Sequence, residues 1–183
     1  MNFKAAALAL ISSLTVGAVP AAATPNTGSF DDHLNLYHTI HSYGVKVNIN
    51  HPEFCHGGID GSYSSQLRVL NVCQDNGYPG GPEVDWTAND LDTLRHEAHH
   101  MIQDCAGSGH GNGYLVHLFA DRQQLLSFID SVYSRAEQRS IMGADSYAGH
   151  NNERQLIELE AFTTAAIIPA DKIADKMNEV CRN

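Results

Sequence analysis

The sequence has few basic residues and, beyond its first two dozen positions, no long apolar run. Eleven Lys and Arg stand against 21 Asp and Glu, a formal net charge of −10 over 183 residues. This balance argues against nucleic acid or an anionic membrane surface as a partner. No stretch after residue 23 is long and apolar enough to span a bilayer. We therefore expect neither nucleic acid nor membrane among the partners of a soluble product.

The one apolar run lies at the start and has the pattern of a signal peptide. Lys4 supplies a positive charge, residues 5–19 are uncharged and mostly apolar, and three alanines at 21–23 fit a cleavage site. We predict a signal peptide over residues 1–23 and a single domain over residues 24–183. The mature chain would then be secreted or periplasmic.

Cysteine is also scarce, and no pair has the Cys-x-x-Cys spacing of a zinc knuckle. The four residues are Cys55, Cys73, Cys105 and Cys181. An even number in an exported chain is typical of two disulfides, for which three pairings are possible. We favour Cys55–Cys73, which would close a local hairpin, and Cys105–Cys181, which would join the end of a central helix to the C-terminal region.

Hydrophobic periodicity and turn residues indicate short strands followed by helices. Strands are expected at 45–49, 62–64 and 67–73, and helices at 31–42, 88–106, 121–142, 153–168 and 170–181. Pro169 is expected at the first position of the last helix. The predicted class is α+β and mostly helical, with a short β-sheet ahead of a central helix and C-terminal helices.

The central helix carries the pattern His96-Glu97-x-x-His100. Residues four apart share a helix face, so both imidazoles can reach one metal ion, and Glu97 can reach a water molecule beside it. Thr87 and Asp90 fit a capping box at the start of this helix, and Gly107 fits a left-handed end. An apolar stripe lies opposite the two histidines, formed by Leu91, Leu94, Ala98, Met101, Ile102 and Cys105.

This helix resembles that of the HExxH zinc metallopeptidases, the zincin superfamily. The resemblance implies a small zincin-like domain, a Zn²⁺ cofactor and a peptide or protein substrate. It implies that zinc activates a water molecule and that Glu97, as general base, takes the proton from that water. It also implies an edge strand along the cleft, for which 67–73 is the candidate, although an ordinary core strand fits this segment equally well.

A catalytic zinc needs a third protein ligand. The metzincin pattern is absent, because a third histidine would fall at position 106, which is Ala106. The chain is closer to the gluzincins, whose third ligand is a Glu on a later helix. In several of those families a small residue follows the ligand by three positions, as Ala161 follows Glu158. This implies Glu158 as the third ligand, although those families often carry Asp or Asn where Phe162 stands.

Other assignments stay open at this point. Glu160 is the reserve for the third ligand, and His110, in a glycine-rich loop, is a further one. Of Glu158 and Glu160, the one that does not bind zinc is expected to be a surface carboxylate. Tyr147 or His150 could stabilise the oxyanion. The alternative function is a non-catalytic zinc-binding or interaction domain, although such a domain would not need Glu97.

Overall fold

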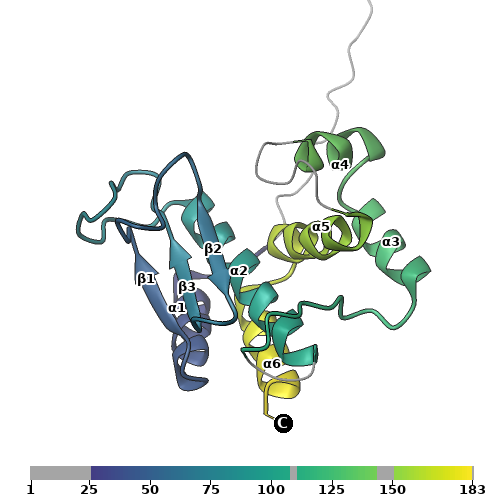
Figure 1. Cartoon of the computed structure of the whole chain (residues 1–183), viewed down its shortest axis with the longest axis horizontal. Helices are drawn as coiled ribbons and strands as arrows, with labels where there is room; N and C mark the ends of the chain where they lie inside the picture. Colours follow the sequence, from purple (N-terminus) through teal and green to yellow (C-terminus); the bar gives the residue numbers. More distant parts are fainter. Residues whose placement is uncertain (1–25, 108–110, 144–150, 183) are drawn as a thin grey trace, which may run out of the picture.

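A computed structural model describes residues 26–107, 111–143 and 151–182 of the chain. Within these residues the fold is α+β, with one three-stranded sheet and six helices (Figure 1). The α+β class predicted from the sequence is therefore confirmed. None of the described helices is long and apolar enough to cross a membrane. The predicted signal peptide, residues 1–23, lies outside the described residues.

The long helix α2 is the centre of the fold. It packs against strand β2 and helices α1, α5 and α6 (Figure 1). Ahead of it come α1, Phe30–Ser42; β1, Lys46–Ile49; β2, Gly61–Ser64; and β3, Val69–Val72. It spans Ala88–Ala106 and is followed by α3, Arg122–Asp130; α4, Arg135–Met142; α5, Asn152–Ile167; and α6, Ala170–Val180. Pro169, expected at the first position of α6, is instead its N-cap.

The sheet has the order β1-β3-β2, with β1 and β3 parallel and β2 and β3 antiparallel. The segment 67–73, predicted as a candidate edge strand, is therefore the central strand, which corrects that expectation. Strands β2 and β3 both pack against α2, and Gly61 at the start of β2 explains the close approach of that strand. A Cβ on Gly61 would lie 2.5 Å from Thr93 Cγ2 and 3.2 Å from Glu97 Cγ, both on α2.

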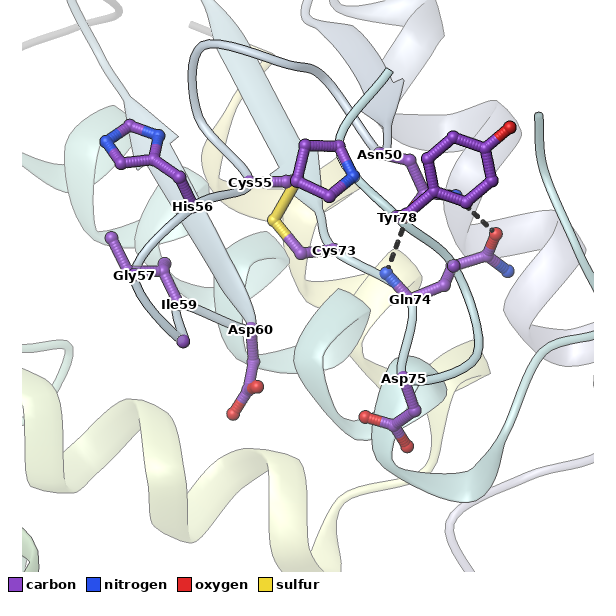
Figure 2. Close-up of a pocket in the computed structure, with 13 residues that line it drawn as sticks. Asn50, Cys55, His56, Gly57, Ile59, Asp60, Cys73, Gln74, Asp75 and Tyr78 are labelled. Atoms are coloured by element: carbon purple, nitrogen blue, oxygen red, sulfur yellow. Dashed lines mark hydrogen bonds between the residues drawn. A yellow bond between two sulfur atoms is a disulfide. The ribbon is translucent and has the colours of Figure 1, made fainter. Parts of the chain in front are cut away.

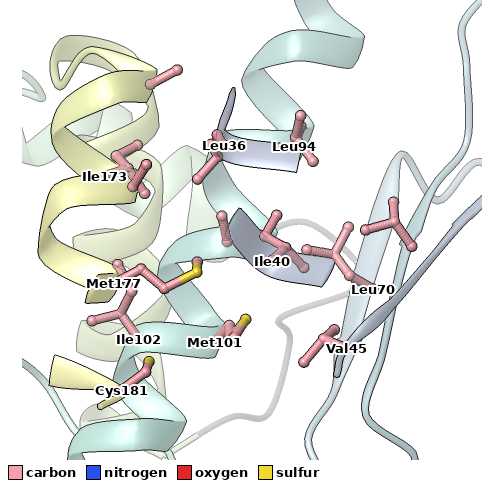
Figure 3. Close-up of a cluster of buried hydrophobic side chains, with 14 of the residues drawn as sticks. Leu36, Ile40, Val45, Leu70, Leu94, Met101, Ile102, Ile173, Met177 and Cys181 are labelled. Atoms are coloured by element: carbon pink, nitrogen blue, oxygen red, sulfur yellow. The ribbon is translucent and has the colours of Figure 1, made fainter. Parts of the chain in front are cut away.

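A single apolar core joins the sheet to three helices (Figure 3). The predicted stripe of α2 supplies Leu94, Ala98, Met101 and Ile102, each at most 1% exposed. Facing them are Leu36, Ile40, Val45, Leu70, Ile173 and Met177. This packing fixes the rotation of α2 about its axis, so the opposite face, with His96 and His100, points away from the core. The core therefore orients the candidate metal ligands.

The ends of α2 show one correct and one wrong prediction. Thr87 and Asp90 form the predicted capping box, in which each side chain accepts the other's backbone N–H. Gly107 was predicted in a left-handed conformation, but its φ is −78°. Glycine is needed there for a different reason, because a Cβ would lie 2.1 Å from the carbonyl oxygen of Tyr114. The end of α2 is thus fixed by a crossing segment rather than by backbone conformation.

Replacing Gly107 with Ala should therefore destabilise the fold. The added methyl group has to displace the Tyr114 backbone, and overpacking of this kind costs about 1–3 kcal/mol. Urea unfolding of the G107A variant, followed by circular dichroism, measures the loss. A stability equal to that of the wild type would show that the 114 segment does not approach the helix end so closely.

The long helix predicted over 121–142 is two helices, α3 and α4, which corrects that expectation. Ser134 starts the second one with a capping box, because its hydroxyl accepts the Glu137 N–H and Glu137 accepts the Ser134 N–H. The break between α3 and α4 allows a second apolar cluster to form against α5. Its members are Leu125, Ile129, Met142, Leu156 and Leu159.

Both predicted disulfides are present, Cys55–Cys73 and Cys105–Cys181. The second ties the end of α2 to the end of α6. The first borders a cavity of about 370 Å³ (Figure 2). Two hydrogen bonds between Asn50 and Gln74 hold the loops beside this disulfide together. The described residues contain no free cysteine.

A buried polar contact fastens α1 to α2. His33, 2% exposed, donates from Nδ1 to the Ser29 carbonyl at 2.7 Å and accepts from Arg95 at Nε2. Arg95 also donates to the Ala165 carbonyl and to Asp92, both at 2.9 Å. Burial lowers the pKa of His33, and the neighbouring Arg95 charge lowers it further. The hydrogen bond to Ser29 raises this pKa but does not outweigh the two. The fold therefore requires a neutral imidazole at this position.

This requirement predicts acid sensitivity. The pKa of His33 is lower in the folded chain, so protonation favours the unfolded chain. The contribution of neutral His33 to the free energy of unfolding is fully present above the pKa of about 6.5 that histidine has in the unfolded chain. This contribution is lost progressively as the pH falls below that value. His33→Gln retains a donor and an acceptor without titrating, so the stability difference between the two proteins should shrink or reverse between pH 7.5 and pH 5. Urea unfolding at each pH measures it; a constant difference would contradict the prediction.

Candidate metal centre

The two histidines of the motif point at the same place. Helix α2 brings His96 and His100 to one face, and their Nε2 atoms lie 3.0 Å apart. The two rings are edge to face, with centroids 4.7 Å apart. Both residues are buried, at 7% and 5% exposure. Two imidazole nitrogens this close together, away from bulk water, form a natural pair of metal ligands.

The third group comes from α5. Glu158 Oε2 lies 3.1 Å from His100 Nε2 and 3.6 Å from His96 Nε2. The structure therefore brings together three residues that could hold a metal ion, with one ligand atom from each. Ala161 and Ala165, both fully buried on α5, allow it to lie close to α2. A bond from Arg95 to the Ala165 carbonyl links the two helices.

Glu160, the reserve ligand, is not part of the cluster of His96, His100 and Glu158. If it bound no metal it was expected to be a surface carboxylate, and that expectation is wrong. Glu160 is 0% exposed. Its carboxylate accepts from the Leu118 N–H at 3.0 Å, contacts His99 Nε2 at 3.2 Å and accepts from Gln103 Nε2 at 3.3 Å. These bonds occupy the carboxylate away from the metal ligands. Apolar residues at helical spacing around Glu160 were the sequence signal of its burial.

Glu97 lies between the ligands and the sheet and is 6% exposed. Burial raises its pKa, the charge of Glu158 adds to this, and the nearby His96 and His100 oppose it. A backbone hydrogen bond from Tyr63, in β2, also lowers the pKa. The carboxylate is thus held against the sheet strand that lies nearest to the cluster. A buried carboxylate with a raised pKa is suited to accept a proton.

The ligands also change one another's proton affinity. Burial would lower the pKa of His100, but the hydrogen bond and charge of Glu158 outweigh it and raise the pKa to about 9. Burial would raise the pKa of Glu158, whereas bonds from both imidazoles hold that pKa far below its usual range. The carboxylate is therefore ionised and presents a negative charge to the point where the three ligand atoms meet.

The two imidazoles are held in different ways. His100 Nδ1 donates a hydrogen bond to Gln103 Oε1, which lies 2.7 Å away. His96 Nδ1 is buried without a hydrogen-bond partner among the described residues. The ring of Phe162 packs against His96 instead, with centroids 4.4 Å apart.

Several supporting residues were not identified from the sequence. Tyr63 donates from its hydroxyl to Asp104 at 2.9 Å, which secures β2 to α2, and Gln103 contacts a ligand. The position of Gln103, three residues after His100, was an available signal, whereas the pairing of Tyr63 with α2 depends on tertiary packing. His110, Tyr147 and His150 lie outside the described residues. The cavity beside Cys55–Cys73 has no lining residue in common with the metal cluster.

No protein-family model matches the chain, and no curated protein or solved structure matches it either.

Proposed function

We propose that this chain is an exported zinc-dependent metallopeptidase whose metal ligands are His96, His100 and Glu158. The observation that carries the proposal is the triangle of their ligand atoms, with sides of 3.0, 3.1 and 3.6 Å. Tetrahedral zinc with ligands at about 2.0–2.1 Å keeps them roughly 3.3 Å apart. Two imidazoles and one carboxylate are also the ligand set of one class of catalytic zinc site.

Glu97 supplies the catalytic base. Zinc, when bound, would provide Lewis-acid activation of water and of the scissile carbonyl. Glu97 would accept the proton from the attacking water and return it to the leaving amine, so that a peptide bond is broken and one water molecule consumed. Its buried position and raised pKa support this role, since a proton held there is shielded from bulk water.

The substrate would be an extended peptide. Strand β2 has a sheet neighbour on one side only, because β3 is its single partner among the described strands. The strand lies close to the base, since a Cβ on Gly61 would lie 3.2 Å from Glu97 Cγ. A peptide adding to this strand by backbone hydrogen bonds would pass close to the metal ligands. The proposed role of an edge strand thus moves from 67–73 to β2.

Export is supported by the two disulfides, which form and persist in oxidising compartments. A non-catalytic zinc-binding domain is the second candidate, and one observation favours it. His96, Glu97, His100 and Glu158 are each between 5% and 8% exposed, which leaves little open surface for a substrate. A peptidase would have to open this face, whereas a domain that only binds metal would not.

Metal content and cleavage measured on one preparation test the proposal. We expect about one zinc per chain, cleavage of a denatured protein, and loss of cleavage on adding a chelator with recovery on adding zinc. Stoichiometric zinc without cleavage of any of a panel of denatured proteins would favour the non-catalytic domain. Absence of zinc from a protein refolded with the metal would overturn both candidates.

A further inference from the structure

Two fully buried polar residues lie behind His100 and have no place in the proposed chemistry. Gln103 and Glu160 are both 0% exposed. Their side chains meet where α2 and α5 pack together, with Gln103 Nε2 3.3 Å from Glu160 Oε2. A buried amide and a buried carboxylate destabilise a fold unless every polar atom is bonded. The partners of these atoms therefore indicate what the pair does.

The orientation of the Gln103 amide is fixed by its neighbours. Its Nε2 faces the Ile157 carbonyl at 3.1 Å and Glu160 Oε2, and both of these atoms only accept hydrogen bonds. A flipped amide would set its oxygen against two other oxygens. The amide oxygen must therefore face His100, whose Nδ1 lies 2.7 Å away. Because an amide oxygen only accepts, the His100 Nδ1 has to carry the proton.

Glu160 is fixed in turn by donors from another segment. The backbone N–H of Leu118 reaches both of its oxygens, at 3.0 and 3.3 Å, and His99 Nε2 lies 3.2 Å from one of them. The segment around 118 is itself bonded to α2, through the Val116 N–H and the Gln103 carbonyl. The carboxylate thus has donors around it that hold it in position toward Gln103.

We propose that Gln103 and Glu160 are positioning residues that set the tautomer and direction of His100. Donors at Leu118 and His99 fix the position of the Glu160 carboxylate. The carboxylate accepts from the Gln103 amide and so fixes its orientation. The amide oxygen then keeps the His100 proton on Nδ1. Nε2, which faces Glu158 and His96, is then the atom of His100 that is presented to the metal. His96 has no such support, since its Nδ1 lacks a partner among the described residues. The centre thus has one ligand fixed by hydrogen bonds and one held by packing.

This inference rests on the proposed metal site but not on peptidase activity. Residues that hold a metal ligand in place typically change metal affinity by about 10–100-fold when they are removed. Gln103→Met keeps the length of the side chain and removes the acceptor. Glu160→Gln keeps its shape, but its single oxygen cannot accept from both His99 Nε2 and Gln103 Nε2, which lie against different oxygens of the carboxylate. Each variant should therefore weaken zinc binding.

The experiment is a double-mutant cycle read as the zinc dissociation constant, by competition with a chromogenic chelator. We expect each single variant to bind zinc about 10–100-fold more weakly. The double variant should bind no more weakly than Gln103→Met alone, because Glu160 acts on His100 only through Gln103. Gln124→Met, at an exposed position of α3, is the matched control and should bind as the wild type does. Additive losses would overturn the proposal in favour of two separate packing defects.

A spectroscopic measurement on the zinc-bound wild type tests the same proposal without any variant, so it applies even if the variants fail to fold. Nitrogen-15 NMR should show the His100 proton on Nδ1, hydrogen-bonded and slow to exchange, with Nε2 on the metal. A His100 bound to zinc through Nδ1 would overturn the proposal. Zinc binding by the wild type with no loss in Gln103→Met would also overturn it while leaving the metal site intact. A wild type that binds no zinc would end the proposed function together with this inference.

Discussion

Glu97→Gln should leave zinc bound and lower turnover by about 10²–10⁴-fold. The amide has the size of the carboxylate, and β2 is also secured to α2 by the bond from the Tyr63 hydroxyl to Asp104, so the strand should stay in place. The amide cannot take a proton from water at neutral pH. Zinc content by atomic absorption and cleavage rate on one preparation separate these effects.

The control for this variant is Glu153→Gln, which removes a carboxylate from an exposed position on α5. Glu153 pairs with Arg122 at the surface, and both side chains are more than half exposed. We expect neither zinc content nor turnover to change in it. A Glu97→Gln enzyme as fast as the wild type would rule out the proposed mechanism, whatever its metal content.

Glu158→Ala should abolish stoichiometric zinc binding, with a loss of affinity beyond the roughly 100-fold upper range for residues that only support a ligand. Two imidazoles would remain, and His96 is held by packing without a hydrogen bond at its Nδ1 among the described residues. The fold should persist, because this carboxylate faces the imidazoles rather than the apolar core. Chelator competition measures the affinity, and circular dichroism checks the fold.

The comparison with Glu160→Ala decides whether the two carboxylates have been assigned correctly. That variant leaves the Leu118 N–H without its acceptor and removes one of the two acceptors of the Gln103 amide, and an unsatisfied buried group costs about 1–3 kcal/mol. Its main effect should therefore be on the free energy of unfolding, with a smaller effect on zinc. If Glu160→Ala abolished zinc binding in a stable fold and Glu158→Ala did not, the assignment of the third ligand would be reversed.

Local signals in the sequence predicted much of the motif helix and its surroundings. The spacing of His96 and His100, the capping box at Thr87 and the apolar stripe each depend on residues within a few turns of one helix. Both cysteine pairings were also correctly chosen among the three that were possible. The helix features depend only on neighbouring residues, and the disulfides could be chosen because four cysteines allow only three pairings.

The features that were missed depend on segments far apart in the chain. The order of the strands places β3 between two others, and no local pattern in residues 67–73 carries that information. Gly107 looked like a left-handed helix end, whereas the contact that requires glycine comes from the Tyr114 carbonyl. The burial of Glu160 depends on Leu118, 42 residues away. Tertiary contacts of this kind decide what local propensity leaves open.

The disulfide between Cys105 and Cys181 has a consequence for the order in which the centre is assembled. Its loop of 76 residues encloses Glu158, while His96 and His100 lie ahead of it in the chain. A chain that emerges N-terminus first presents two ligands, then the third, and only afterwards the cysteine that closes the loop. Metal captured by the histidines alone would be held weakly and could escape. Covalent closure therefore comes only after all three proposed ligands have been synthesised.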